Sequence, residues 1–179
     1  YMPSRERADL DALYAAGGSD RVALYLNYER QEESGVYVDG QTYLPAAWVD
    51  ANLNERFYWD ANEEILVYAL PEEIVKSDET TVDEDGKKIL YRDGDAVYLS
   101  LALIQKYTDV RLQAYDGEAQ KRVFVENNWD PVTVADAAWS AKIRLRGGLK
   151  SPIVTEIKRG GTVTVLEQYD NWARVMTPD

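Results

Sequence analysis

The sequence contains no cysteine and no histidine among its 179 residues. Without thiolates and imidazoles it has no disulfide framework, no zinc site of the usual ligand types, no cysteine nucleophile and no histidine-dependent mechanism. Uninterrupted apolar stretches are only about the size of Ile65 to Leu70, far short of the roughly 18 residues that span a bilayer. We therefore expect no cofactor, no metal site and no membrane span in this chain.

The N-terminal residues Tyr1 to Arg7 have neither an initiator methionine nor the basic-then-apolar layout of a signal peptide. This is expected of a piece cut from a longer protein, with an export signal or an anchor removed from its upstream part. Acidic residues are also unevenly distributed. Residues 1–132 hold 13 Lys and Arg against 27 Asp and Glu, whereas residues 133–179 hold 7 against 5. The change indicates a domain boundary, and the acidic front part argues against nucleic-acid binding because it repels phosphate.

The pattern of apolar residues predicts the first elements of the chain. Residues 3–16 are predicted to form a short amphipathic helix that ends at Gly17-Gly18. We assign residues 1–19 to this N-terminal helix and expect it to pack on the domain that follows. Strict alternation from Val22 to Tyr28 then predicts a strand, and a second strand runs into the hairpin turn Asp39-Gly40.

From residue 39 onward, a series of hairpin, helix and hairpin occurs twice. Leu44 corresponds to Leu99 at a spacing of 55 residues, and Ile65 to Val123 at a spacing of 58. We predict that residues 20–132 form a duplicated domain whose two copies pack as a pseudo-symmetric pair.

Each predicted helix has a residue suited to its start. Pro45 suits the first turn, where its missing N–H is harmless, and the Ser100 hydroxyl can cap the second helix.

An acidic segment joins the two copies. Asp85-Gly86 predicts a turn, and the residues on both sides, Thr81-Val82 and Ile89 to Tyr91, predict an exposed hairpin. The carboxylates of Asp83, Glu84 and Asp85 suggest calcium as an alternative role. However, an EF-type loop needs about twelve residues with alternating ligands and a terminal Glu, and this segment lacks that pattern.

The last segment, residues 133–179, consists of short predicted strands separated by glycine-rich turns, which is typical of a small barrel. The predicted fold class is therefore α+β, mostly β: a duplicated hairpin-helix-hairpin domain followed by a small β-barrel.

The last segment resembles the bacterial Src homology 3-like family. The residues that carry the likeness are Ile143-Arg144-Leu145, Ile153 to Ile157, Thr162 to Leu166 and Asp170-Asn171-Trp172-Ala173-Arg174-Val175. In that family a final strand closes the barrel. Here the sequence stops at Thr177-Pro178-Asp179, so the resemblance implies a barrel with an open edge, whose closing strand is either missing or supplied from elsewhere.

Residues 20–127 resemble the copper amine oxidase N-terminal-like, or stalk, domain. The likeness lies in Tyr43-Leu44-Pro45, Phe57 to Asp60, Leu66 to Pro71 and Tyr98-Leu99-Ser100. This domain is not the copper site of those oxidases, in agreement with the missing histidines. The combination looks like the N-terminal part of secreted Gram-positive proteins whose next domain is a family 18, chitinase-like glycoside hydrolase. That implies an extracellular or cell-envelope location in a Gram-positive bacterium and a downstream catalytic domain in the same polypeptide.

Catalysis by the chain itself is not expected. A glycosidase needs two carboxyl groups placed across the glycosidic bond. The clusters Asp60, Glu63, Glu64 and Asp83 to Asp85 lie at predicted turns and do not match the acid motif of family 18. We predict no catalytic residues here.

Aromatic residues suggest a ligand instead, because the chain has 13 Tyr and 5 Trp against 2 Phe. Such rings stack on sugars and also occur in protein interfaces and half-buried sheets. Burial is the favoured role for Tyr43, Trp48 and Trp59. The candidate ligand-binding residues lie in the last segment: Trp139, Arg144, Tyr169 and Trp172. For Trp172, however, a core or barrel-closing position is the favoured role.

The sequence is compatible with two functions. One is a wall-targeting module that binds a cell-wall glycan or peptide, and the other is a passive stalk or protein-interaction module that binds no glycan.

Overall fold

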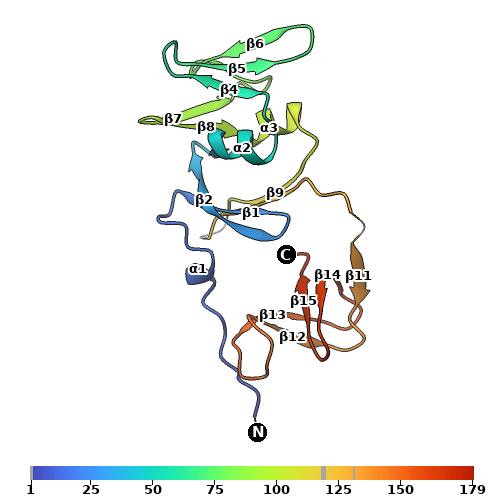
Figure 1. The fold of residues 1–179 in the computed structure, drawn as a ribbon. Coiled ribbons are helices and arrows are strands. Elements are labelled where there is room, and N and C mark those ends of the chain that lie inside the picture. The colour runs from blue at the N-terminus through green and yellow to red at the C-terminus, as the bar shows by residue number, and fades with distance from the viewer. Residues whose placement is uncertain (1, 118–119, 131) are drawn as a thin grey trace. The chain divides into compact units, whose positions relative to one another are not determined.

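The computed structural model describes residues 2–117, 120–130 and 132–179. Within these residues the fold has fifteen strands and three short helices (Figure 1), so the predicted mostly-β class is confirmed. The chain forms two compact units. We call Tyr14–Asn128 the central unit, and the residues up to Leu13 together with Trp129–Asp179 the terminal unit.

A seven-stranded sheet forms the base of the central unit, in the order β7-β8-β3-β2-β1-β10-β9. Neighbouring strands are antiparallel except for the parallel pair β1 and β10. The strands are β1 (Arg21–Leu26), β2 (Glu29–Val38), β3 (Gln41–Pro45), β7 (Leu90–Asp93), β8 (Ala96–Ser100), β9 (Arg111–Tyr115) and β10 (Arg122–Glu126).

The predicted hairpin turn at Asp39-Gly40 is confirmed. Both residues have positive φ, 49° and 79°, as a two-residue turn whose twist matches its strands requires. It joins β2 to β3 with Val38 opposite Gln41.

A second, three-stranded sheet and two helices complete this unit. The sheet has the order β4 (Phe57–Asp60), β5 (Ile65–Ala69) and β6 (Ile74–Ser77). Helix α2 (Ala46–Asn52) directly follows β3, and α3 (Leu101–Tyr107) directly follows β8. The predicted cap of α3 is confirmed, because the Leu103 N–H donates to Ser100 Oγ at 3.1 Å. Pro45 occupies the N-cap position of α2 rather than its first turn.

The order strand, helix, hairpin occurs in β3-α2-β4-β5 and again in β8-α3-β9-β10. Strands β3 and β8 pair with each other, and Leu44 lies opposite Leu99. The following hairpins differ in their surroundings, since β5 pairs with β6 in the small sheet whereas β10 pairs with β1 in the large one. The equivalence of the two copies therefore stays a prediction.

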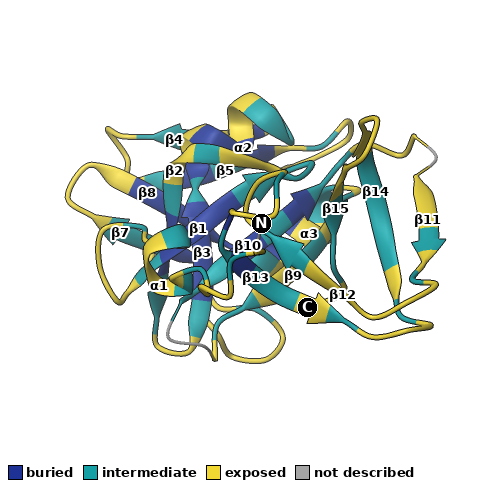
Figure 2. Cartoon of the chain, turned by 90° about the horizontal axis from the view of Figure 1, so that it is seen from below, coloured by how far each residue is buried: buried dark blue, intermediate teal, exposed yellow. Residues whose placement is uncertain are grey.

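The main core contains side chains from the large sheet, both helices and the small sheet. Because strand residues alternate between faces, Leu44 and Leu99 enter this core while Tyr43 and Tyr98 pack in a second cluster. The buried residues colour much of β1, β3, β8 and β10 dark blue in Figure 2. The favoured burial of Tyr43 and Trp48 is confirmed, and Trp59 is half-buried against the main core.

The acidic segment between the copies forms the predicted turn. Gly86 has φ 75°, and Asp83 Oδ1 accepts hydrogen bonds from the backbone N–H groups of Asp85 and Lys87 at 2.9 and 3.0 Å. The carboxylate of Asp83 thus stabilises the local backbone. Val82 and Lys88 form a single β-bridge across the turn. The predicted exposed hairpin is nevertheless wrong beyond this turn, because Ile89 and Leu90 are buried in the main core.

In the terminal unit the strands form two sheets rather than the predicted barrel. One has the order β11 (Thr133–Asp136), β14 (Thr162–Gln168), β15 (Ala173–Met176), and the other pairs β12 (Ala141–Arg144) with β13 (Ile153–Ile157). Among the described residues no strand ladder joins the two sheets, so no closed barrel forms.

The predicted helix over residues 3–16 is wrong except for α1 (Leu10–Leu13). Instead, the chain before α1 pairs with the turn and strand around β13. The Ile153 N–H donates to the Glu6 carbonyl at 2.7 Å, the Ala8 N–H to the Ile153 carbonyl at 2.6 Å, and the Ser4 N–H to the Leu149 carbonyl at 2.7 Å. The backbone hydrogen bonds that this segment makes with an unpaired strand edge stabilise it more than its weak helix propensity would stabilise a helix. Residues 4–8 therefore belong to the terminal unit, contrary to the expected packing on the following domain.

None of the helices in the described ranges has the length and apolar character needed to cross a membrane.

Candidate binding groove of the terminal unit

Three of the four predicted ligand-binding residues line one groove of about 660 Å³, which we call the terminal groove. Arg144 comes from the end of β12, and Tyr169 and Trp172 come from the turn between β14 and β15. The other lining residues are Lys142, Ile143, Leu145, Arg146, Gly147, Ala173, Arg174 and Val175.

Backbone contacts hold the two aromatic residues at this end of the sheet. The Tyr169 N–H donates to the Trp172 carbonyl at 2.7 Å. Gln168 Nε2 donates to the carbonyls of Tyr169 and Trp172 at 3.0 and 3.4 Å. The turn is thereby closed, and both rings lie along the same groove.

Trp172 lies against Gly147. A Cβ atom added to that glycine would stand 3.6 Å from Trp172 Cγ, which is ordinary van der Waals contact, so the ring packs beside this part of the backbone. The Trp172 side chain is 37% exposed and belongs to neither buried cluster. This exposure argues against the core position that the sequence favours for Trp172, and the ring lines the terminal groove.

Tyr169 is 55% exposed, and its hydroxyl donates to the carboxylate of Glu167. That hydrogen bond raises the pKa of Tyr169. Arg174 Nη1 lies 3.8 Å from the same carboxylate. The phenol is thus oriented by its neighbours while its ring stays accessible to a ligand.

Arg144 has mainly a structural part in the groove wall. Its Nη1 donates to the carbonyls of Ser4 and Ser151 at 2.9 and 2.7 Å. The guanidinium thereby joins the N-terminal segment to the loop before β13. Its charge still contributes to the groove, where Lys142, Arg146 and Arg174 are further cations.

Trp139 is not among the residues that line this groove. Its side chain is 75% exposed, and the Arg159 guanidinium lies 5.6 Å from its ring centroid. Sequence reasoning placed Trp139 with the other aromatics and missed Lys142 and Arg146. The alternation of cations and apolar residues from Lys142 to Arg146 was the available signal, since alternate residues of a strand share a face.

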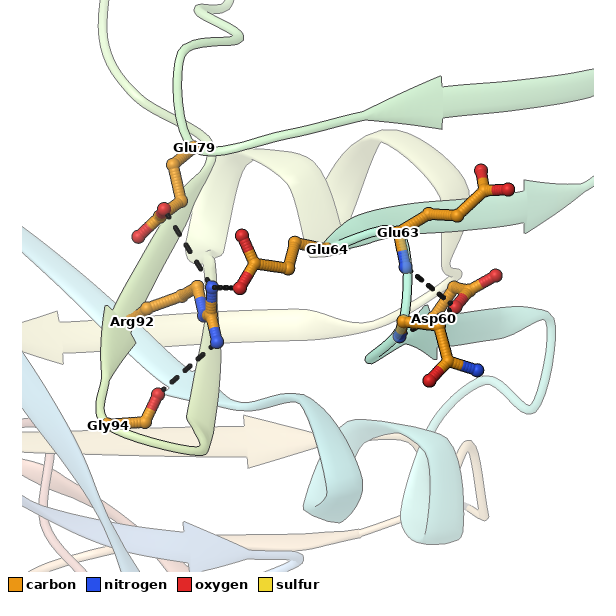
Figure 3. A network of polar contacts seen from close by, with 7 residues as sticks. Asp60, Glu63, Glu64, Glu79, Arg92 and Gly94 are labelled. Atoms are coloured by element: carbon orange, nitrogen blue, oxygen red, sulfur yellow. Dashed lines mark hydrogen bonds and ion pairs between the residues drawn. The ribbon is translucent and has the colours of Figure 1, made fainter.

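In the carboxylate cluster of Asp60, Glu63 and Glu64, side chains stabilise a turn and form an ion pair (Figure 3). Asp60 Oδ1 accepts from the backbone N–H groups of Asn62 and Glu63 at 3.0 and 3.1 Å. Glu64 lies 3.2 Å from Arg92, and Glu79 lies 4.0 Å from the same guanidinium. Within the described part of the chain, acidic side chains do not gather in a group of three able to hold a metal ion.

Comparison with protein-family models, with curated proteins and with solved structures gave no match to this chain.

Proposed function

We propose that this chain is a non-catalytic, wall-targeting region of a secreted cell-envelope protein, with the terminal groove as its ligand site. The observation that carries the proposal is the pair of accessible rings, Tyr169 and Trp172, in one groove with Lys142, Arg146 and Arg174. Aromatic faces stack on sugar rings or on peptide groups, and cationic side chains donate to carbonyl and carboxylate oxygens. Both features suit a cell-wall glycan or its peptide.

The finer architecture is part of the same proposal. We infer a duplicated domain that resembles the copper amine oxidase N-terminal-like family, supported by the pairing of Leu44 with Leu99 between the two copies. The terminal unit is proposed to be an open relative of the bacterial Src homology 3-like fold. The parent protein would be an extracellular, family 18-like glycoside hydrolase of a Gram-positive bacterium, whose catalytic domain this region positions on chitin-like or peptidoglycan glycans.

Sedimentation with purified polymers tests the ligand site. The protein is mixed with peptidoglycan or with chitin, and the fraction that sediments with the polymer is measured. We expect retention on at least one polymer and its loss in Tyr169→Ala, without a lower melting temperature because the ring is largely exposed. Trp139→Ala is the matched control, since it removes an exposed ring of the same unit outside the groove.

Two results argue against this function. Protein that stays in the supernatant with both polymers favours a passive stalk or protein-interaction module. Equal loss of retention in both variants places the binding surface outside the terminal groove.

A further inference from the structure

A second groove lies wholly within the central unit and is independent of the terminal groove. It has a volume of about 360 Å³ and lies between the start of α2, strand β4 and the start of β8. We call it the central groove. Its lining residues are Pro45, Ala46, Ala47, Asp50, Glu55, Phe57, Tyr58, Trp59, Leu66, Asp95, Ala96, Val97 and Tyr98.

The floor of the central groove is apolar. Phe57, Leu66 and Val97 are buried members of the main core, so the groove ends on packed side chains. At its side, Tyr58 is 63% exposed, which is a large accessible apolar surface for a residue in a strand. A ligand with an aliphatic or aromatic part would gain free energy by covering this surface.

Charge of one sign surrounds this floor. Every charged side chain among the residues lining the central groove is a carboxylate, namely Asp50, Glu55 and Asp95, and all three residues are exposed. The unit itself is strongly acidic, with 11 Lys and Arg against 23 Asp and Glu over residues 14–128. Carboxylates around an apolar floor complement a cation on an aliphatic stem.

Trp59 is held in place by a neighbouring ion-pair network. The Arg92 guanidinium lies 5.2 Å from the Trp59 ring centroid. Figure 3 shows this guanidinium between the carboxylates of Glu64 and Glu79, and its Nη2 also donates to the Gly94 carbonyl at 3.4 Å. The charge of Arg92 is thereby balanced by acids, so the groove keeps its negative character. A ring fixed before binding lowers the entropy cost of association.

We propose that the central groove binds a basic peptide segment of a partner protein, with a lysine or arginine side chain entering the groove. The aliphatic stem packs on Phe57 and Val97, and the cationic end lies among Asp50, Glu55 and Asp95. The exposed Tyr58 ring covers the adjacent part of the peptide, where a cation or an apolar residue can contact its face.

Fluorescence anisotropy of a labelled peptide, Gly-Lys-Leu-Lys-Gly amide, with the full chain tests this proposal at low ionic strength. We expect saturable binding that weakens by at least about tenfold when both lysines are ε-acetylated, because acetylation removes the charge and keeps the stem. Equal affinity for the acetylated peptide would overturn the proposal, as would the absence of saturable binding.

Matched variants separate the groove from the general field of the acidic unit. Asp50→Asn with Asp95→Asn removes two groove charges and is expected to weaken peptide binding about fivefold or more. Glu32→Gln with Glu33→Gln removes two exposed charges elsewhere in the unit and should change binding less than about twofold. Equal loss in both double variants would mean nonspecific attraction and would contradict the proposal.

A third variant tests the apolar contact. Tyr58→Ala should weaken the peptide several-fold without lowering the melting temperature, because this side chain is mostly exposed in the free protein. Unchanged peptide affinity in this variant would refute the assigned contact, and unchanged wall retention would show that the terminal groove is a separate site.

Discussion

At the scale of single residues, Trp48 combines burial with a polar anchor. Its side chain is 3% exposed within the main core, and its Nε1 donates to Gln31 Oε1 at 3.1 Å. Trp48→Ala is expected to lower the free energy of unfolding by about 3–5 kcal/mol, through lost apolar contacts and the remaining cavity. This loss is measured by urea denaturation, monitored by circular dichroism. Gln31→Ala removes this acceptor, together with the exposed hydrogen bond from Gln31 Nε2 to the Glu29 carbonyl, and should cost about 1 kcal/mol. A loss below about 1 kcal/mol for Trp48→Ala would contradict its buried position.

A tyrosine in the central unit links stability to alkaline pH. Burial and, after it, the hydrogen bond with Glu126 raise the pKa of Tyr28 to about 12. In the unfolded chain a tyrosine titrates near its ordinary pKa of about 10. The folded state therefore holds this proton more tightly, and the resulting stability is present below pH 10 and is lost as the pH rises toward 12.

Comparison with Tyr28→Phe measures this effect. Between about pH 10 and 12 the wild-type protein should lose free energy of unfolding more steeply than Tyr28→Phe, because phenylalanine has no proton to lose. All other side chains are the same in both proteins, so their contributions largely cancel in the difference. Parallel curves over this range would show that Tyr28 is not perturbed in the fold.

At the scale of elements, the sequence predicts those turns and helix caps that depend on residues close together in the chain. The turn Asp39-Gly40 and the cap Ser100 were found from sequence because each acts through its own backbone neighbours. The parallel pairing of β1 with β10 had no such signal. It joins Ala23 to Arg122, about a hundred residues away, and depends on the packing of the whole unit.

The candidate site shows the same limit. Tyr169 and Trp172 were found because aromatic residues are conspicuous, and a tight turn keeps them together. Trp139 was misplaced because its distance from the groove depends on how β11 to β15 divide into two sheets. The prediction of an N-terminal helix is wrong for a related reason. Residues 4–8 form backbone hydrogen bonds with a distant part of the chain, and no local sequence pattern indicates this pairing.

The pairing of the N-terminal segment with β13 predicts a local effect of truncation. Deleting residues 1–8 removes the Glu6 acceptor and the Ala8 donor that bond to Ile153, and it leaves Arg144 without the Ser4 carbonyl. Amide hydrogens of the β12–β13 pair should then exchange faster with solvent. Amides of β1 and β10, in the central unit, are the internal control and should keep their protection. Unchanged exchange throughout β13 would show that this segment does not stabilise it.

At the scale of the whole molecule, the two units differ in how much they bury. The central unit holds both buried clusters, whereas in the described part of the terminal unit only Ser151 and Ile153 are buried. Figure 2 accordingly shows teal and yellow along β11, β12 and β14. Since apolar burial is the main favourable term in folding, the terminal unit should unfold at lower urea concentration than the central unit.

The different charge of the two units gives their transitions different salt dependences. Over residues 14–128 there are 11 Lys and Arg against 23 Asp and Glu, whereas the residues of the terminal unit hold 9 of each kind. Mutual repulsion of carboxylates destabilises the compact central unit, and salt screens this repulsion. Adding sodium chloride should therefore raise the urea midpoint of the central unit and leave that of the terminal unit nearly constant. Hydrogen exchange at increasing urea concentrations distinguishes the two transitions, because amides of β10 report on the central unit and amides of β14 report on the terminal unit. A common midpoint that moves equally with salt would show instead that the units unfold as one.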